Sequence, residues 1–258
     1  MSTVLYSSPI FGPVSSRRLG ISLGINLMPS DGKICTFDCI YCECGLNCER
    51  RPVSGRPTRL EIRNALEQRL TAMSAEGVEP NVLTFAGNGE PTAHPDFAGI
   101  IDDVTELRDR FFPKAKVTVL GNGTRIMKKP VFDALLKVDN NIQKLDTVDI
   151  EFIRAFDRPA GNYDLDRIIE TLKAFNGHVI IQTMFLGGTA LGRNFDNTSE
   201  KYVAPWIDAV RYIAPEKVMI YTIARETPFT TLEKASPQVL DSIARRLRSY
   251  GLETSVSY

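Results

Sequence analysis

Histidine is nearly absent from this sequence, which has only His94 and His178 among its 258 residues. The two lie far apart and show no H-x-x-x-H or similar spacing, so a histidine metal site is not expected. No Ser-His-Asp arrangement and no Walker-type glycine-rich motif is recognisable either. His94 instead lies close to a candidate ligand-binding segment, where capping the following helix is the simpler interpretation.

Net charge is absent as well, because 31 basic residues balance 31 acidic ones. The chain therefore has no overall electrostatic attraction for nucleic acid or for an anionic membrane. Arg17 and Arg18 are a candidate local basic patch, although an ordinary solvated surface pair shows the same pattern.

Long apolar runs are also missing. No stretch approaches the roughly 18 apolar residues of a membrane span, and the first residues lack the pattern of a secretory signal. We expect a cytoplasmic protein with no membrane partner, a compartment in which clustered thiols stay reduced. With 43% hydrophobic residues and no linker-like tract, residues 1–258 are predicted to form one domain.

What the sequence does contain is a cluster of five cysteines within residues 35–48. Cys35, Cys39 and Cys42 follow a C-x-x-x-C-x-x-C spacing. Thiolates hold iron–sulfur clusters, and a cubane cluster with only three thiolates leaves one iron free to bind another ligand. These three cysteines are the predicted metal ligands, and the open iron is the predicted seat of chemistry.

Other interpretations of the cysteines remain open. A structural zinc site usually has two separated cysteine pairs, which are not seen here. A ferredoxin-type carrier has four thiolates per cluster, and Cys44 or Cys48 could supply the fourth. A disulfide framework is typical of small secreted chains, not of this one. Two extra thiols on a loop, or a redox role, are the alternatives for Cys44 and Cys48.

Short apolar runs alternate with segments of helical period, which is typical of βα units around a parallel sheet. Six strands are predicted, at residues 19–27, 82–85, 116–120, 141–145, 179–184 and 218–222. Six helices are predicted, at residues 59–76, 96–110, 130–137, 165–175, 200–214 and 237–250. In such folds ligands bind at the carboxyl ends of the strands.

The cysteine spacing, with the aromatic Tyr41 just before the last cysteine, resembles the radical S-adenosylmethionine (radical SAM) superfamily. The resemblance implies a [4Fe–4S] cluster, SAM chelated at the open iron with Tyr41 near the cofactor, and reductive cleavage of SAM to a 5′-deoxyadenosyl radical that abstracts a hydrogen. It also implies an α/β fold, an open (βα)6 partial TIM barrel that leaves nothing after the sixth helix. An electron donor such as flavodoxin or ferredoxin is expected as a partner.

Gly87, Asn88, Gly89 and Glu90 follow the second predicted strand. Glycines let the backbone approach a ligand, and a carboxylate can accept a hydrogen bond from an ammonium. In the superfamily the matching Gly-Gly-Glu segment binds the SAM amino group; here Asn88 and Gly89 occupy its first two positions. Glu90 is expected to orient SAM rather than to stabilise the fold.

Further candidates follow later strands. Asn122 lies in Gly121-Asn122-Gly123-Thr124, which is similar to a family segment that contacts SAM but also suits a tight turn. Lys144 and Asp146 are two apart and share one strand face. The resemblance suggests that both contact SAM, whereas an internal salt bridge is the structural alternative.

Gln182 interrupts an apolar run, and a buried amide needs partners, so it is expected to face SAM or substrate. Tyr221, Thr222 and Arg225 lie at the end of the sixth predicted strand, where Arg225 could bind an anionic substrate. Catalytic residues are not identified, and Lys144, Tyr221 and Arg225 are the candidates.

Phe11-Gly12-Pro13-Val14, residues 16–20 and the cluster-loop segment 37–42 are similar to the branch of the superfamily grouped with wyosine-base synthesis on tRNA. The chain lacks that branch's additional N-terminal cysteines for a second cluster, so tRNA is a possible but not a favoured substrate. We predict an oxidoreductase or lyase that acts on a small molecule, peptide or protein side chain. The alternatives are a wyosine-like tRNA-modifying enzyme and a non-catalytic iron–sulfur electron carrier or sensor.

Overall fold

The computed structural model describes residues 4–16 and 20–258, so the predicted patch of Arg17 and Arg18 lies outside the described residues. Its centre is an eight-stranded sheet in the order β1-β2-β3-β4-β5-β6-β9-β11. The strands are β1 (Ile10–Ser16), β2 (Gly20–Ile25), β3 (Val82–Phe85), β4 (Lys116–Gly121), β5 (Asn140–Lys144), β6 (Ile180–Met184), β9 (Lys217–Tyr221) and β11 (Thr254–Ser257).

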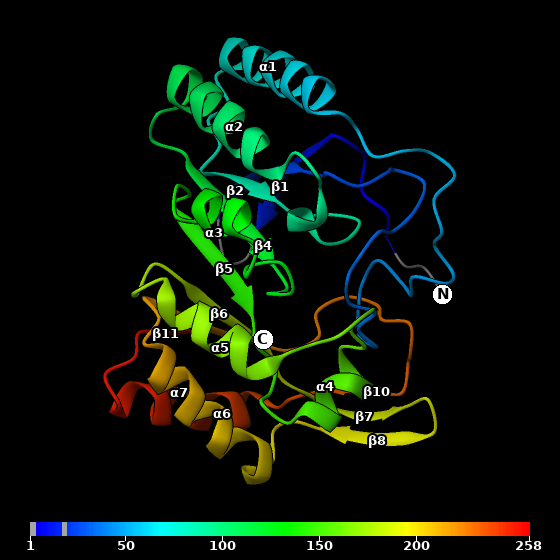
Figure 1. Cartoon of the computed structure of the whole chain (residues 1–258), viewed down its shortest axis with the longest axis vertical. Helices are drawn as coiled ribbons and strands as arrows, with labels where there is room; N and C mark the ends of the chain where they lie inside the picture. Colours follow the sequence, from blue (N-terminus) through cyan, green and yellow to red (C-terminus); the bar gives the residue numbers. More distant parts are fainter. Residues whose placement is uncertain (1–3, 17–19) are drawn as a thin grey trace.

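All neighbouring strands run parallel except β1, which pairs antiparallel with β2. Within the described residues no pairing joins β1 to β11, so the sheet curves without closing. The predicted open α/β barrel is confirmed. In Figure 1 helices α1 to α3 and α5 to α7 lie along one side of the sheet, whereas α4, the small sheet and long loops that include the cysteine loop lie on the other.

The helices are α1 (Arg59–Glu76), η1 (Pro91–Ala93), α2 (Phe97–Phe111), α3 (Lys129–Leu135), α4 (Ile150–Phe156), α5 (Leu165–Ala174), α6 (Glu200–Ile213) and α7 (Pro237–Ser249). A smaller antiparallel sheet, β10-β7-β8, consists of β7 (Leu186–Ala190), β8 (Arg193–Asp196) and β10 (Leu232–Lys234). Among the described residues, no helix combines the length and the apolar character that crossing a bilayer requires.

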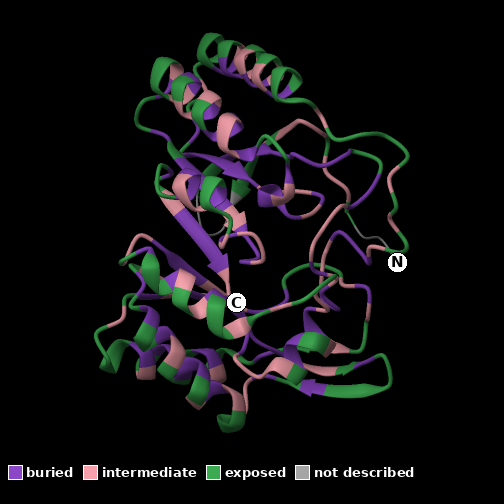
Figure 2. Cartoon of the chain, in the orientation of Figure 1, coloured by how far each residue is buried: buried purple, intermediate pink, exposed green. Residues whose placement is uncertain are grey.

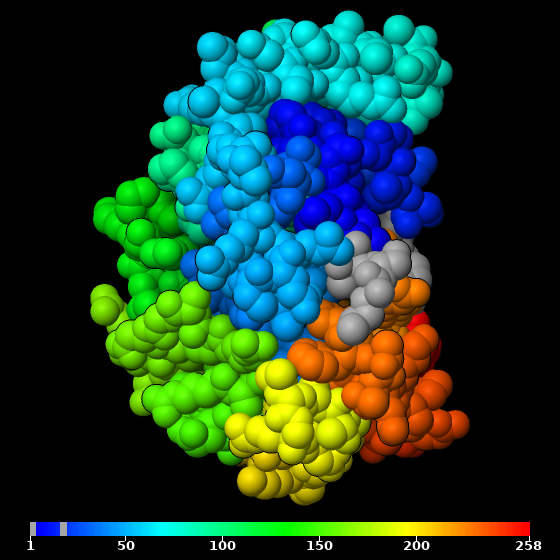
Figure 3. All heavy atoms as spheres, turned by 90° about the vertical axis from the view of Figure 1, so that its right-hand side faces the viewer, coloured from blue at the N-terminus to red at the C-terminus, as the bar shows by residue number. Residues whose placement is uncertain are grey.

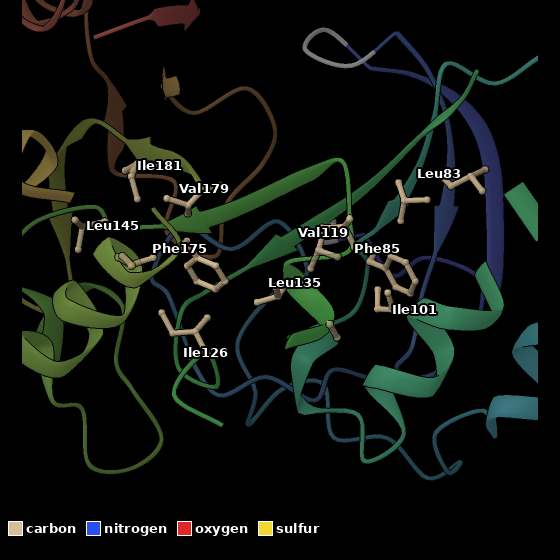
Figure 4. Close-up of a cluster of buried hydrophobic side chains, with 14 of the residues drawn as sticks. Leu83, Phe85, Ile101, Val119, Ile126, Leu135, Leu145, Phe175, Val179 and Ile181 are labelled. Carbon is tan, nitrogen blue, oxygen red and sulfur yellow. The ribbon is translucent and has the colours of Figure 1, made fainter. Parts of the chain in front are cut away.

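The side chains of β3 show how the strands divide the interior. Leu83 and Phe85 point outward and pack against the helices, as Figure 4 shows together with Ile101 of α2 and Leu135 of α3. Thr84 points inward, toward the barrel lumen. The same alternation in the other parallel strands gives one apolar core under the helices and a separate, more polar interior. Figure 2 shows buried strands and helices with exposed outer faces.

The six predicted strands correspond to β2, β3, β4, β5, β6 and β9, with ends shifted by up to two residues. The expectation that nothing follows the sixth helix is wrong, because β11 pairs with β9 at Thr254 and Val218. β1, the small sheet and α4 were not predicted. Each of these elements is short or contains glycine or proline, which weakens the periodic signal.

Candidate active site

The cysteine loop (residues 35–48) is held against the glycine segment that follows β3. An isolated bridge pairs Ile34 with Gly89, where the amide of Ile34 donates to the carbonyl of Asn88 at 3.0 Å. Gly89 has φ +141°, and a Cβ there would lie 1.9 Å from the carbonyl oxygen of Ile34. Glycine is therefore required at this position, because the two backbones are in direct contact.

Hydrogen bonds from its own side chains and to the end of α4 also fix the cysteine loop. The Asn47 side chain donates to the carbonyl of Phe37 at 3.1 Å, and its backbone amide donates to the Asp38 carboxylate at 2.7 Å. The amides of Asp38 and Ile40 donate to the backbone carbonyls at the end of α4, at 2.9 and 3.0 Å. The loop thus has a defined shape through contacts with its own side chains and with α4.

The thiols of Cys35, Cys39 and Cys42 lie close enough to the buried ammonium of Lys33 to interact with its charge. Burial lowers the pKa of Lys33, but the nearby thiolates of all three cysteines outweigh it and raise the pKa. Burial raises the pKa of Cys35 to about 12, although Lys33 opposes the rise. Two further donors reach these thiols: Lys144 Nζ lies 3.3 Å from Cys39 Sγ, and Asn122 Nδ2 lies 3.7 Å from Cys35 Sγ.

This donor set fits an iron–sulfur cluster with three protein thiolates. Among the described residues, no three His, Cys, Asp or Glu side chains converge on the position of a single metal ion. A cubane cluster requires a different arrangement from a single metal ion, because each thiolate binds a separate iron. Amide and ammonium donors beside the sulfurs suit the negative charge that such a cluster carries.

The two remaining cysteines of the loop differ in exposure. Cys44 is buried, and its Sγ donates to the carbonyl of Gly87 at 3.4 Å. A hydrogen bond from Cys44 lowers the pKa of Cys42 to about 6. Cys48 is exposed at the far end of the loop. Cys44 therefore supports the loop and a predicted ligand, whereas Cys48 faces solvent.

Glu90 is buried, and its carboxylate already accepts hydrogen bonds from protein groups. Oε2 accepts from the backbone amide of Asn122 at 2.7 Å, while Oε1 accepts from the amide of Thr92 at 3.0 Å and from the Thr92 hydroxyl. Burial raises the pKa of the Glu90 carboxyl despite these bonds. Glu90 thus caps η1 and joins it to β4, a structural role that the sequence did not indicate.

The other residues of the predicted SAM segment also have structural partners. Asn88 is fully buried, and its amide nitrogen donates to the carbonyls of Tyr6 and Pro29, at 2.8 Å each. Its amide oxygen accepts from the backbone amide of Tyr6 at 2.8 Å. Gly87 has φ +123°, and a side chain there would collide with Asn26. The segment therefore anchors the N-terminal strand to the cysteine loop.

Lys144 and Asp146 form the salt bridge that was the alternative to a cofactor contact, with Nζ 2.9 Å from Oδ2. Lys144 also lies 2.8 Å from the carboxylate of Asp157. Tyr41 donates its hydroxyl to Asp146 and contacts Lys144, whose ammonium lies 4.3 Å from the ring centroid. Asp146 accepts from the amide of Met184 at 2.9 Å. One ammonium thus pairs with two carboxylates, and the same ammonium contacts Cys39.

Asp157 belongs to this buried group but was missed from the sequence. Burial raises the pKa of its carboxyl to about 7, and the Lys144 ammonium acts against that rise. The only sequence signal was an acidic residue directly after the apolar segment 150–156. Helix α4 spans just seven residues, which is too short for a periodic pattern to stand out.

A cavity of about 560 Å³ extends from the cysteine loop into the barrel lumen. From the cysteine loop, Tyr41, Cys42 and Glu43 line this cavity. Deeper in the lumen its lining includes Ser22, Thr84, Leu120, Ile142, Gln182 and Met219. The cavity thus connects one predicted cluster ligand with the inward-facing residues of the strands.

Gln182 and Tyr221 face this cavity side by side, with Gln182 Nε2 donating to the Tyr221 hydroxyl at 2.9 Å. The buried Oε1 of Gln182 has no hydrogen-bond partner among the described residues. A buried amide oxygen that lacks a donor is favourable only when a ligand or water supplies one. Among the predicted site residues, Gln182 is therefore the one whose side chain most clearly keeps a hydrogen-bond acceptor available for a ligand.

Arg225 lies at the mouth of the cavity, where it contacts residues that the sequence did not single out. Its Nη1 lies 2.7 Å from Oε2 of Glu43 and also contacts the hydroxyl of Tyr6, which itself lies 2.9 Å from Oε1 of Glu43. Thr222 lines the cavity nearby, and its hydroxyl accepts from the amide of Ala235 at 2.8 Å. The contact of Arg225 with Glu43 and Tyr6 joins the loop after β9 to the cysteine loop and to the N-terminal segment.

Comparison with known proteins places this geometry in a family. A UPF0026 protein of Methanocaldococcus jannaschii is 36% identical over 69% of this chain and 54% of its own length. A radical SAM methyltransferase from Sphaerobacter thermophilus has a TM-score of 0.68 at 15% identity, covering 92% of this chain and 66% of that one. Streptococcus suis SuiB bound to S-adenosylmethionine has a TM-score of 0.61 at 18% identity, covering 91% of this chain.

The chain spans about half the length of SuiB and of the archaeal relative. At such low identities the solved structures establish the fold alone. The family follows from the sequence: the model of the radical SAM superfamily matches residues 30–198, which is more than half of the chain and includes the cysteine loop. The chain therefore belongs to the radical SAM superfamily, whose enzymes use a [4Fe–4S] cluster and S-adenosylmethionine.

Proposed function

We propose that Cys35, Cys39 and Cys42 hold the cluster and that SAM binds between the cysteine loop and the cavity. One observation carries this assignment: Tyr41 and Cys42 line the same cavity as Gln182. A ligand at the open iron would therefore lie against the barrel lumen, where a substrate group can meet it. When bound and reduced, the cluster supplies the electron that cleaves SAM into methionine and a 5′-deoxyadenosyl radical.

The residues of the chain supply binding and orientation. Lys33 and Lys144 offset the negative charge of the thiolates, and Asn122 donates toward Cys35. Glu90 has acceptor capacity beyond the bonds that it makes, and we assign it the SAM ammonium. Gln182 Oε1 accepts from SAM or from the substrate. Tyr221 and Arg225 are assigned to the substrate side, because both line the cavity beyond Cys42.

The reaction that we propose is an oxidoreductase or lyase reaction on a small molecule, a peptide or a protein side chain. Apart from Glu43, Arg225 and Glu226, the cavity is lined by apolar residues and neutral hydrogen-bonding groups. Arg225 is already paired with Glu43. A solved structure of SuiB contains its precursor peptide, which places peptides among the substrates to be tested first. A tRNA-modifying role, as in the wyosine branch, remains the second candidate.

We also propose that the chain works as one domain in the cytoplasm. The eight-stranded sheet takes its strands from Ile10 to Ser257, which supports a single folding unit. The five cysteines are free thiols, as expected in a reducing compartment.

Anaerobic reconstitution with iron and sulfide tests this function. The holoprotein should convert SAM to 5′-deoxyadenosine after reduction with dithionite, and Cys48→Ala is the matched control for Cys42→Ala. A protein that holds a reducible cluster but leaves SAM intact would be an electron carrier or a sensor. Adding candidate peptides and, separately, tRNA should identify the substrate that raises the yield.

A further inference from the structure

The arginine loop (residues 49–57) follows the cysteine loop directly in the chain. It carries Arg50, Arg51 and Arg56 against a single acid, Glu49. None of its residues lines the cavity. In Figure 3 the segment around residue 50, in light blue, covers the centre of the face on which the cysteine loop lies. A partner on this loop would therefore be close to the cluster without entering the substrate space.

Backbone contacts give the arginine loop a fixed shape. The carboxylate of Asp31 accepts from the amides of Val53 and Ser54, at 2.9 Å each, and from the Ser54 hydroxyl at 2.5 Å. The amide of Lys33 donates to the carbonyl of Arg50 at 2.6 Å, two residues before Cys35. Asp31 is itself exposed, but its carboxylate is held by the backbone and hydroxyl groups of Val53 and Ser54 rather than by an arginine of the loop.

The outer surface of the loop carries arginines without an ion-pair partner among the described residues, together with an exposed apolar side chain. Arg51 and Arg56 are exposed, and neither makes an ion pair or a hydrogen bond with another described residue. Val53 is 98% exposed, although valine is usually buried. Unpaired cations around an apolar contact are the features of a docking surface for an acidic protein.

We propose that the arginine loop docks a small acidic redox protein that reduces the cluster. This inference rests on the proposed cluster site at Cys35, Cys39 and Cys42. One electron leaves the reduced centre of the partner, which is oxidised by one electron, and reduces the cluster by one electron; no bond is formed or broken. A nucleic acid fits less well, because two exposed arginines neutralise few phosphates and the loop is separate from the cavity.

The test is binding of an oxidised acidic flavodoxin to the anaerobically reconstituted holoprotein, measured by calorimetry at low and at physiological salt. Arg51→Glu with Arg56→Glu should weaken binding about tenfold or more at low salt and should flatten the salt dependence. Arg51→Gln with Arg56→Gln should have a smaller effect in the same direction. The matched control is Lys114→Glu with Arg245→Glu, two exposed residues away from the cysteine loop, which should change the affinity less than about twofold.

Equal affinity of the charge-reversed variant and the unmodified protein would overturn the proposal, as would an equal loss in the control. Tighter binding of bulk tRNA than of flavodoxin, lost in the same variant, would also overturn it and make the loop a nucleic-acid site. Iron content and dithionite-driven 5′-deoxyadenosine should be unchanged in all variants. If the unmodified protein yields no 5′-deoxyadenosine with dithionite, the proposed function fails; if only the flavodoxin result is negative, the docking surface alone fails.

Discussion

The ammonium of Lys144 lies 2.8 Å from the carboxylate of Asp157, and both side chains are largely buried beneath the cysteine loop. Breaking a buried pair leaves a charge without its partner, which usually costs more than the pair contributes. Here Asp146 still pairs with Lys144, so part of the interaction survives.

Asp157→Asn should therefore lower the free energy of unfolding of the apoprotein by about 1–3 kcal/mol. Urea denaturation measures it. The matched control is Asp133→Asn, which removes the exposed pair with Lys129 and should cost less than about 0.5 kcal/mol. Similar losses in both variants would show that the buried group does not support the loop.

The cysteines should separate into ligands and non-ligands. Replacing Cys35, Cys39 or Cys42 by alanine should remove most of the reconstituted iron, because each thiolate binds its own iron. Cys48→Ala should keep full iron content, since that side chain is exposed at the end of the loop. Iron and sulfide analysis with the cluster's visible absorption measures the outcome, and iron loss in Cys48→Ala equal to that in Cys42→Ala would contradict the assignment.

Glu90→Gln should affect both cofactor binding and folding. The amide cannot accept from Asn122 and from Thr92 in the way that both carboxylate oxygens do, so the apoprotein should lose about 1–3 kcal/mol of stability. SAM affinity of the holoprotein should fall by about tenfold or more through loss of a charge-assisted hydrogen bond. A stability loss with unchanged SAM affinity would leave Glu90 only its structural role.

Gly89→Ala should be strongly destabilising. The new Cβ would lie 1.9 Å from the carbonyl oxygen of Ile34, and φ +141° is unfavourable for any other residue. We expect a loss of about 3 kcal/mol or more in apoprotein stability. Gly55→Ala is the control, because nothing lies within 4 Å of its added Cβ. A mild effect at Gly89 would mean that the bridge to the cysteine loop yields easily.

His94 should make stability depend on pH. Burial lowers the pKa of its imidazole, whose Nε2 lies 2.9 Å from the carbonyl of Pro57 and whose Nδ1 accepts from the amide of Asp96. The folded state therefore binds fewer protons than the unfolded state just below about pH 6.5. Stability should be full above that value and fall as the pH drops through it toward the lowered pKa. His94→Gln should reduce this slope in urea titrations at pH 5 to 7, and an unchanged slope would contradict the prediction.

The sequence predicted the parts of this molecule that depend on local pattern. The apolar runs around Leu83 and Ile181 identified the inner strands. The spacing of Cys35, Cys39 and Cys42 indicated the family to which the chain belongs. β1 was missed because Gly12 and Pro13 interrupt it, and its register shifts between Phe11 and Val14.

Contacts between residues that are far apart in the chain could not be predicted from the sequence. Arg225 and Glu43 are 182 positions apart, and nothing in either neighbourhood indicates that they pair. Likewise, Asn88 was assigned to the cofactor by its position, whereas the fold commits its amide to Tyr6 and Pro29. Such roles depend on which strands become neighbours, which a single sequence does not specify.

The open sheet has a further consequence for the behaviour of the protein at high concentration. Two free strand edges are potential templates for pairing with another chain, which leads to aggregation. β1 limits this risk at one edge, since Pro13 lacks an amide donor and the register shift beside it bends the strand. At the other edge β11 has only four residues, Thr254–Ser257. The barrel thus stays open, while each of its two edge strands is protected against pairing with another chain into fibrils.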